Sequence, residues 1–412
     1  MGATPGRPLD VVLLNWRDST HPEGGGAEVY AETVAAGLAA RGHRVTLFCA
    51  DHGRAPRDEL RDGYRVVRRG SRTSVYLRAA LRGLRGGFGR PDVVVDVQNG
   101  MPFLARLWSR SPVVVLVHHV HREQWGVVFG PLVARVGWAV ESRLAPRLHR
   151  SLPHVAVSGV TRDELADLGL PRSGVTVVHN GTARPLHTEV ERTVHPSVVV
   201  LGRLVPHKRV EIALAALARL APVQPDLRLT VVGRGWWEPQ LRAEAERLGV
   251  TDRVDFLGHV DEDVKARVLA ESWLLAVPSL KEGWGLAVVE AASHGTPAVA
   301  FHGAGGLSES IVDGVTGRLV DGASLATAED AFAEAVAGLL DDAATRAWMG
   351  RHARTHAAQF TWESTVERFE QVLEQAVHGA PALPVPLLPV AADMAADLVA
   401  DLQVDAAEAR PA

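Results

Sequence analysis

The chain alternates short apolar runs with helical stretches, and it does so twice. In the first half, apolar runs bounded by turn residues occupy 10–14, 44–48, 92–97, 113–117 and 154–157. Short runs that are apolar throughout are typical of parallel strands buried on both faces. Helical stretches lie between several of them, at 27–41 and 133–148. This order predicts βαβ units and a parallel sheet.

The same pattern restarts after residue 196. Strands are expected at 197–201, 227–232, 253–256, 273–277 and 297–301, and helices at 210–220, 239–248, 263–271 and 287–294. The intervening segment carries two prolines and mixed charges without an apolar period, which is typical of a linker. We therefore expect an α/β protein with two Rossmann-like domains, 1–183 and 197–360, joined by a linker at 184–196.

Three further helical stretches follow, at 324–340, 343–359 and 361–378. Thr361 is the expected N-cap of the last, with Ser364 in its first turn. We expect this helix to cross back to the N-terminal domain. Beyond it, residues 379–412 are rich in proline and alanine, a composition that predicts a flexible tail.

Composition excludes several classes of protein. A chain of 412 residues with 47% hydrophobic residues is long enough for two apolar cores, and a net charge of -4 argues against a nucleic-acid partner. A single cysteine, Cys49, excludes an internal disulfide bond. No secretory core or membrane-spanning apolar run is found, so we expect a cytoplasmic protein, and the arginine-rich usage favours a bacterial source.

Two segments carry the chemistry. One is the glycine-rich loop 281–286, which leads from a strand into a helix, where free N–H groups favour phosphate oxygens. Glu290, about one turn into that helix, needs hydrogen-bond donors, and ribose hydroxyls would supply them. The other is Gly202-Arg203 followed by Lys208, two cations after a strand, which suit a diphosphate whose negative charge grows as it leaves.

These motifs resemble a known family. Gly24-Gly25-Gly26-Ala27-Glu28, Gly202-Arg203 with Lys208, Val231-Val232-Gly233-Arg234-Gly235, Phe256-Leu257-Gly258, Pro278-Ser279 with Glu282 and Glu290, and Gly295-Thr296-Pro297 occur in the family's order. The chain is similar over residues 10–378 to the GT4-like retaining group 1 glycosyltransferases. The resemblance implies a GT-B fold, two facing Rossmann-like domains with the active site in the cleft between them.

The resemblance also implies roles for individual residues. Arg203 and Lys208 would bind the donor diphosphate and Glu290 the ribose, while Glu282 and the amides of Gly283, Trp284, Gly285 and Leu286 would contact the transferred sugar and phosphates. Gly233, His259 and Val260 would lie near the base. Gly25 and Gly26 would approach the donor through their backbone, and a histidine after the strand 113–117 would contact the sugar. Arg209 stands where the family usually has glycine, and it either adds a cation near the phosphates or reaches solvent.

The histidine assignment has three candidates, because His118, His119 and His121 all follow that strand. Position directly after the strand favours His118. A zinc site is the alternative use of these residues, with Glu123 as the carboxylate at ligand spacing. We expect no metal and no cofactor, with a nucleoside diphosphate sugar as co-substrate.

The implied reaction is transfer of a hexosyl group to a hydroxyl with retention at the anomeric carbon. The acceptor is left open between a glycolipid, a polysaccharide and a secondary metabolite. No carboxylate is placed by the sequence beneath the sugar, so a same-face substitution is favoured over a two-carboxylate mechanism. The alternatives are a nucleotide-sugar epimerase and an inactive nucleotide-sugar-binding protein. A dinucleotide oxidoreductase is disfavoured because Val29 interrupts the Gly-x-Gly-x-x-Gly pattern.

The segment 63–91 contains eight arginines and no acidic residue. Within it, Leu77, Leu81 and Leu84 share one helical face, next to Arg78, Arg82 and Arg85. Three interpretations fit: a surface helix whose leucines face the core, contact with the inner face of the plasma membrane, and an anionic soluble acceptor. Three tryptophans, Trp125, Trp138 and Trp284, are candidates to line a sugar cleft, with core packing favoured for Trp138.

Overall fold

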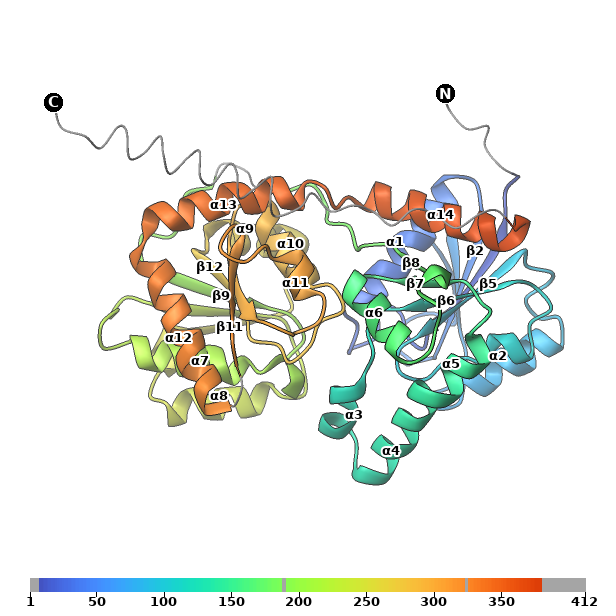
Figure 1. Cartoon of the computed structure of the whole chain (residues 1–412), viewed down its shortest axis with the longest axis horizontal. Coiled ribbons are helices and arrows are strands. Elements are labelled where there is room, and N and C mark those ends of the chain that lie inside the picture. The colour runs from blue at the N-terminus through green and yellow to red at the C-terminus, as the bar shows by residue number, and fades with distance from the viewer. Residues whose placement is uncertain (1–6, 187–189, 323–324, 380–412) are drawn as a thin grey trace. The chain divides into compact units, whose positions relative to one another are not determined.

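The computed structural model describes residues 7–186, 190–322 and 325–379. Contacts divide this part of the chain into two compact units. Unit 1 contains the described residues up to 183, together with 281–286 and 360–379, and unit 2 contains those of 184–280 and 287–359. Both units are α/β (Figure 1). The segment 281–286 therefore packs with unit 1 although its flanking strand and helix belong to unit 2.

Unit 1 is built on a sheet with the order β3-β4-β2-β1-β5-β6-β7-β8 in its described residues. The strands are β1 (Asp10–Leu14), β2 (Arg44–Cys49), β3 (Asp58–Arg61), β4 (Tyr64–Arg68), β5 (Val93–Gln98), β6 (Val113–Val117), β7 (His154–Ala156) and β8 (Val175–Val177). Only the β3–β4 pair is antiparallel among these strands. Its helices are α1 (Gly26–Ala40), α2 (Val75–Leu84), α3 (Arg122–Val128), α4 (Pro131–Ala139), α5 (Ala145–His149), α6 (Gly159–Asp167) and α14 (Trp362–His378).

Unit 2 is built on a parallel sheet with the order β11-β10-β9-β12-β13-β14. The strands are β9 (Ser197–Leu201), β10 (Arg228–Val232), β11 (Val254–Gly258), β12 (Leu274–Val277), β13 (Ala298–Phe301) and β14 (Gly317–Val320). The helices are α7 (Val210–Leu220), α8 (Glu238–Arg247), α9 (Glu262–Glu271), α10 (Leu286–Ser293), α11 (Leu307–Ser310), α12 (Leu325–Asp341) and α13 (Ala343–Ala357). Helices α7 and α12 lie on one side of the strands and α10 on the other (Figure 1).

The predicted α/β class with two Rossmann-like sheets is confirmed. Strands β1, β6 and β9 match their predicted bounds, and the helix predicted at 133–148 is a continuous run in which a π-helical turn, Val140–Leu144, joins α4 to α5. Thr361 caps α14, since its side chain accepts a hydrogen bond from the Ser364 N–H. The sequence pattern does not predict the β3–β4 hairpin, whose strands are short and rich in charge.

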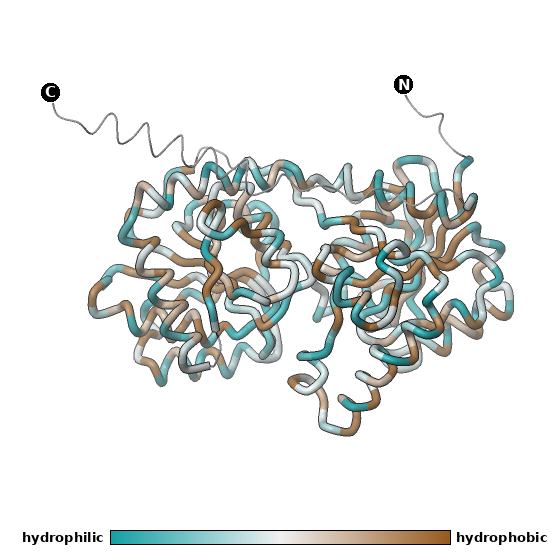
Figure 2. Tube along the Cα trace, viewed as in Figure 1, coloured by the Kyte–Doolittle hydropathy of each residue, from teal (hydrophilic) through white to brown (hydrophobic). Residues whose placement is uncertain are grey.

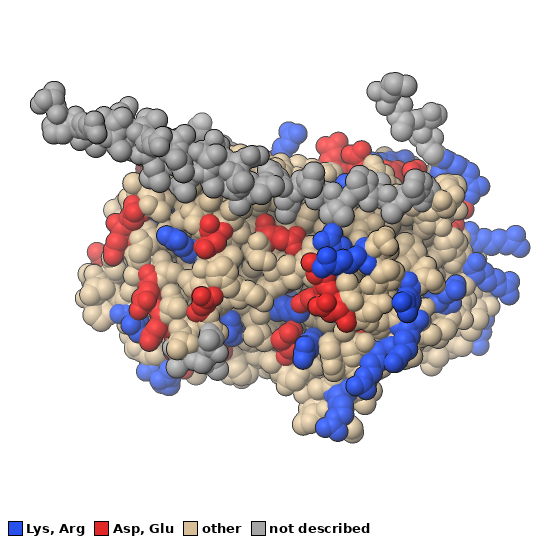
Figure 3. Space-filling view, viewed as in Figure 1, with Lys and Arg blue, Asp and Glu red and all other residues tan. Residues whose placement is uncertain are grey.

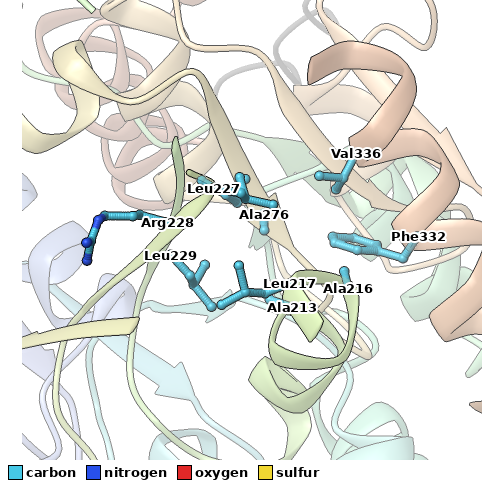
Figure 4. A pocket seen from close by; sticks show the side chains of 10 residues that line it. Ala213, Ala216, Leu217, Leu227, Arg228, Leu229, Ala276, Phe332 and Val336 are labelled. Carbon is cyan, nitrogen blue, oxygen red and sulfur yellow. The ribbon is translucent and has the colours of Figure 1, made fainter. Parts of the chain in front are cut away.

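Apolar residues concentrate inside each unit. Figure 2 shows the brown, hydrophobic stretches of the chain along the strands. The core of unit 2 is tightly filled, with one cavity of about 10 Å³ between α7, α12 and β10 (Figure 4). Its lining comes from Ala213, Ala216 and Leu217 on α7, Phe332 and Val336 on α12, and Leu229 on β10. A space this small and this apolar stays dry and forms part of the core packing.

Helix α14 is held on unit 1 by packing and by charge. It packs on α1, where the methyl groups of Val366 fill the space that a side chain on Gly37 would need. At its exposed edge, the Glu370 carboxylate accepts from Arg41 at 2.6 Å and lies 2.7 Å from His43 Nε2. The C-terminal helix is therefore an integral layer of unit 1.

Two glycines bring the ends of β9 and β10 into contact in unit 2. Gly233 has φ +130°, and a Cβ atom on it would lie 1.9 Å from the carbonyl oxygen of Gly202. Only glycine avoids both the backbone strain and the collision. The close approach sets the spacing of the strand ends from which Arg203 emerges.

We predict that Gly233→Ala lowers the free energy of unfolding by roughly 2 to 4 kcal/mol, because strain and overpacking add. The matched control is Gly338→Ala at an exposed position of helix α12, where a Cβ meets nothing within 4 Å. That substitution should stabilise by about 0.5 to 1 kcal/mol, because glycine is a poor helix former. Urea unfolding of both variants measures the difference, and equal effects would contradict the packing assignment.

Candidate active site

Unit 2 has its switch point between β9 and β12, where the sheet order reverses direction along the chain. In open α/β sheets, ligands bind beyond the carboxyl ends of the strands at such a point. Arg203 follows β9 there, held on both sides because Gly202 N–H donates to Val232 O and Leu204 N–H to Arg234 O, each at 3.0 Å. The main chain on either side of Arg203 is therefore fixed at the end of β9.

Lys208 reaches the same strand end. It closes a short 3₁₀ turn, Pro206–Lys208, and its Nζ lies 3.9 Å from the position a Cβ would take on Gly202. The His207 carbonyl in this turn accepts the Leu280 N–H at 2.8 Å, which ties the turn to the segment after β12. Two cations are thus placed over the end of β9.

Arg209 is half-buried, so the alternative in which it reaches solvent is not what the structure has. Its backbone has φ +48°, the left-handed region that favours glycine, which gives a physical reason for glycine at this place. Its guanidinium donates to the Pro278 carbonyl at 2.8 Å and lies 4.7 Å from the centre of the Phe301 ring. The side chain is therefore turned inward against the loop after β12 and anchors that loop.

Glu290 on α10 is held by a lysine that the sequence pattern does not single out. Lys265 on α9 contacts Glu290 Oε1 at 2.8 Å and also Glu262. Burial raises the pKa of Glu290, against the opposing pull of the Lys265 ammonium. Burial also acts to lower the pKa of Lys265, but Glu290 and Glu262 outweigh it and the net shift is upward. Lys265 thus supplies one donor to Glu290, for which the sequence predicts ribose hydroxyls as donors.

His259 and Val260 follow β11 at the carboxyl edge of the same sheet, one exposed and one half-buried. The turn before them uses Gly258 at φ +68°, with Arg234 packed against it. Gly233 at the end of β10 lies on the same edge. The structure thus brings these predicted residues to the edge that carries Arg203 and Lys208.

In unit 1, the glycine loop after β1 is locked by Glu28. Gly25 is the N-cap of α1, and its N–H donates to Glu28 Oε2 at 2.7 Å. Glu28 Oε1 accepts from the guanidinium of Arg17 at 2.7 Å, and both side chains are buried. Because the N–H of Gly25 is engaged and those of Glu28 and Val29 donate to the Gly25 carbonyl, a ligand phosphate would meet the N–H groups of Gly26 and Ala27.

The three histidines after β6 have different surroundings. His119 Nε2 lies 3.0 Å from Gln124 Oε1, and His121 Nδ1 lies 2.9 Å from Glu141 Oε1. His118 is buried with its ring edge against Tyr30, and its Nε2 has no hydrogen-bond partner among the described residues. Burial lowers the pKa of His118 to about 4. A buried ring nitrogen without a partner in the protein is available to accept or donate a hydrogen bond to a water molecule or a ligand.

The zinc alternative finds no support in this geometry. In the part of the chain that the structure describes, no three His, Cys, Asp or Glu side chains are grouped so that they could hold a metal ion. Glu123 pairs with Lys281 at 3.2 Å. His121 instead bonds Glu141, and His119 bonds Gln124.

The loop that begins at Lys281 packs within unit 1. Lys281, which the sequence pattern does not single out, is buried and pairs with Glu164 at 2.6 Å and with Glu123. A Cβ on Gly283 would lie 2.2 Å from the His118 carbonyl oxygen, so the loop backbone touches the end of β6. Gly285 adopts φ +95°. Glu282 is half-buried, and the Leu286 side chain lies 3.7 Å from the Cβ position of Gly26.

Two of the three tryptophans do not line a cleft, contrary to that expectation. Trp284 is 2% exposed and packs on the rings of His179 and Phe360. Trp125 is buried, and its Nε1 donates to Glu141 Oε2 at 2.7 Å. Trp138 packs against an apolar cluster of unit 1, as expected. Any contact of Trp284 with a ligand would therefore be through its backbone.

We predict that His118→Phe reduces the loss of unfolding free energy that occurs as the pH falls below neutrality. The folded pKa of His118, about 4, lies below its ordinary value of 6.5, so the unfolded chain binds the proton first. The stability is complete above pH 6.5 and is lost as the pH falls toward 4. At pH 5 the part of this loss that is due to His118 should be on the order of 2 kcal/mol, so the variant should lose that much less than the wild type. His119, His149 and His154, whose pKa values burial also lowers, contribute equally to the loss in both proteins.

Urea unfolding at pH 7 and pH 5 measures this difference. Substitution of the exposed His378 by Phe is the control and should leave the wild-type pH dependence in place. A His118→Phe curve parallel to that of the wild type would show that His118 is not the buried neutral group described here.

Solved structures with a similar backbone show which fold the chain has. Sucrose-phosphate synthase from Thermosynechococcus elongatus matches with a TM-score of 0.76 at 20% identity, covering 90% of this chain and 99% of that one. Anabaena HepE in complex with UDP and glucose matches with a TM-score of 0.68 at 19% identity, covering 89% and 100%. The fold is that of the GT-B glycosyltransferases, as the sequence predicts.

Sequence comparisons narrow the class to a family. Residues 24–183 match Glycosyltransferase Family 4, and residues 189–356 match Glycosyl transferases group 1. Glycogen synthase of Mycobacterium tuberculosis is 30% identical over 420 residues, covering 93% of this chain and 98% of that protein. The chain belongs to the group 1 glycosyltransferases.

A second kind of relative matches over a shorter length. D-inositol 3-phosphate glycosyltransferase of Corynebacterium glutamicum is 36% identical over 199 residues, which is 47% of this chain and 45% of that protein. The chain thus matches about half the length of this relative. Across the described residues, every helix is too short or too polar to cross a membrane.

Proposed function

We propose that the protein transfers a hexosyl group from a nucleoside diphosphate sugar to a hydroxyl acceptor, with retention at the anomeric carbon and without a metal ion. The observation that carries this proposal is the placement of Arg203 and Lys208 over the end of β9, at the switch point of unit 2. Anabaena HepE, which has the same fold, has been solved with UDP and with UDP-glucose. A uridine nucleotide is therefore the first donor to test.

The two cations have complementary roles in the proposed reaction. The planar guanidinium of Arg203 suits bidentate contact with a phosphate, and the Lys208 ammonium adds a point charge. As the bond from the sugar to the diphosphate breaks, negative charge grows on the leaving phosphate, and both cations stabilise it. The leaving phosphate oxygen takes the proton from the attacking acceptor hydroxyl on the same face of the sugar.

Glu290 and His118 orient the donor in this proposal. Lys265 contacts Oε1 of Glu290, and we assign Oε2 to a ribose hydroxyl, which a carboxylate binds well. The neutral ring of His118 offers its Nε2 to a sugar hydroxyl, which would satisfy a nitrogen that is otherwise buried without a partner. Glu282 and the backbone of Gly283 to Leu286 are assigned to the sugar and the phosphates.

A thermal-shift panel tests the donor assignment. We predict that one of UDP, GDP, ADP and dTDP stabilises the wild type by about 2.7 kcal/mol at a concentration of 100 times its dissociation constant. Lys208→Ala should lose most of this ligand-induced shift, because a charge-assisted contact to phosphate is removed. Arg219→Ala, an exposed arginine on α7, is the control and should keep it.

Failure of all four nucleotides to stabilise folded protein would contradict the proposal. A nucleotide sugar that binds but is never cleaved would favour the inactive binding protein. Release of a changed nucleotide sugar without any acceptor would favour the epimerase.

The acceptor side of the proposal rests on exposed apolar faces in unit 1. Leu77 and Leu84 on α2 are 63% and 67% exposed, whereas Val75 and Ala79 of the same helix are buried. The interpretation that the α2 leucines face the core is therefore wrong. Exposed leucines beside arginines are the pattern of a helix that lies in a membrane interface.

A second face of the same kind lies on α4 and α5. Leu132 is 75% exposed, and Val133 and Val136 are exposed beside it. Figure 3 shows a row of basic side chains over this region, where Arg135, Arg143, Arg147 and Arg150 are exposed. We assign both faces to contact with an anionic lipid surface, which makes a lipid-borne hydroxyl the favoured acceptor.

Vesicle flotation tests this contact. We predict that the wild type floats with vesicles of phosphatidylcholine and phosphatidylglycerol but not with phosphatidylcholine alone, and that added salt weakens binding. Leu77→Ser with Leu84→Ser should reduce flotation several-fold, because apolar area is lost from the interface. Leu60→Ser, at an exposed leucine on β3, should not. Equal binding by all variants, or no binding by the wild type, would contradict the membrane assignment.

A further inference from the structure

Unit 2 contains a second cationic cavity, on the side of its sheet away from Arg203 and Lys208. The cavity has a volume of about 310 Å³. Trp273, just before β12, and Gly295, just before β13, line it, so it lies at the amino ends of these strands. The residues proposed to bind the donor follow the carboxyl ends. The cavity is therefore distinct from the candidate active site.

Four arginines converge on this cavity: Arg192, Arg346, Arg351 and Arg354. None of them forms an ion pair with a carboxylate of the described residues. Burial lowers the pKa of Arg346, and the nearby Asp342 carboxylate opposes this shift without reversing it. Such a concentration of like charge is unfavourable unless an anion balances it.

The protein holds three of these arginines in place through main-chain oxygens, and for Arg354 the acceptor is the His294 carbonyl at 3.2 Å. Arg192 donates to the Gly295 carbonyl at 2.6 Å and to Thr296 Oγ1 at 2.5 Å. Arg346 donates to the Leu339 carbonyl at 2.6 Å, and its guanidinium lies 4.1 Å from the centre of the Trp273 ring. Carbonyl groups orient the guanidinium groups but leave their charge uncancelled.

The positive charge of these arginines affects the pKa of Arg192 inside the cavity. Burial, followed by the charges of Arg354 and Arg346, lowers the pKa of Arg192 to about 10. Helix α13 supplies the other three arginines, and it comes close because Gly350 packs on Gly295, where a Cβ would lie 2.4 Å from the carbonyl oxygen. The close packing of α13 therefore places the arginines around one space.

We propose that this cavity binds a small phosphate-bearing molecule, held by the guanidinium groups of Arg351 and Arg354 with Arg192 and Arg346 behind them. A guanidinium group can donate two parallel hydrogen bonds to two oxygens of a phosphate. The double negative charge of a phosphate balances several guanidinium groups together better than a single carboxylate would balance them. The volume is at the lower end of the range for small-molecule sites. It suits inorganic phosphate or a sugar phosphate, which share the same recognised group.

Calorimetric titration of the full chain with inorganic phosphate, glucose 6-phosphate and glucose tests the proposal. We expect phosphate or glucose 6-phosphate to bind, and glucose, which lacks the phosphate, not to bind. Tighter binding of glucose 6-phosphate identifies a sugar phosphate as the ligand, and equal binding identifies the phosphate group alone.

Variants locate the site. Arg351→Ala with Arg354→Ala should weaken binding at least about 10-fold, since two charge-assisted contacts are lost. The matched control, Arg219→Ala with Arg318→Ala, removes two exposed arginines elsewhere in unit 2 and should bind as the wild type does. Lys208→Ala should also keep binding, which separates this site from the proposed donor site. No binding of either phosphate compound, or binding that survives in the Arg351/Arg354 variant, would overturn the proposal.

Discussion

A parallel sheet covered by helices on both faces leaves only its strand ends for chemistry. In unit 2 the central strands β9, β12 and β13 are almost entirely apolar and buried, so polar groups near them reach a ligand only where the strands end. The contact between Gly202 and Gly233 sets how close the ends of β9 and β10 come. Arg203 and Lys208 owe their position to that contact, and the proposed donor site depends on it.

Buried charge is balanced differently at the two edges of this sheet. On the carboxyl edge, Glu290 has Lys265 as a partner and the cations stand over a strand end. On the amino edge, carbonyl groups orient Arg192, Arg346 and Arg354, and none of the four arginines there forms an ion pair with a described carboxylate. The two edges therefore offer cationic sites of different construction, one proposed for a donor and one for a separate phosphate.

The sequence predicts the strands, most helices and the motif residues because apolar periodicity and glycine punctuation are local signals. It does not predict Lys265 or Lys281, since both act through partners distant in the chain, Glu290 and Glu164. It also misplaces the α2 leucines and the side chain of Trp284, because periodicity shows which residues share a face but not what covers it. Helical spacing is the same for a buried stripe and for an exposed one.

The most direct test of the proposed reaction uses water as the acceptor and the nucleotide sugar that stabilises the protein as the donor. Proton NMR follows the hydrogen on the anomeric carbon while the protein slowly cleaves this donor. If Arg203 and Lys208 assist departure of the diphosphate on the face where the acceptor attacks, the first sugar released keeps the donor's anomeric configuration before it equilibrates in solution. Release of the opposite anomer first would contradict a retaining same-face transfer, and no cleavage of any bound donor would contradict the assignment of catalysis to this site.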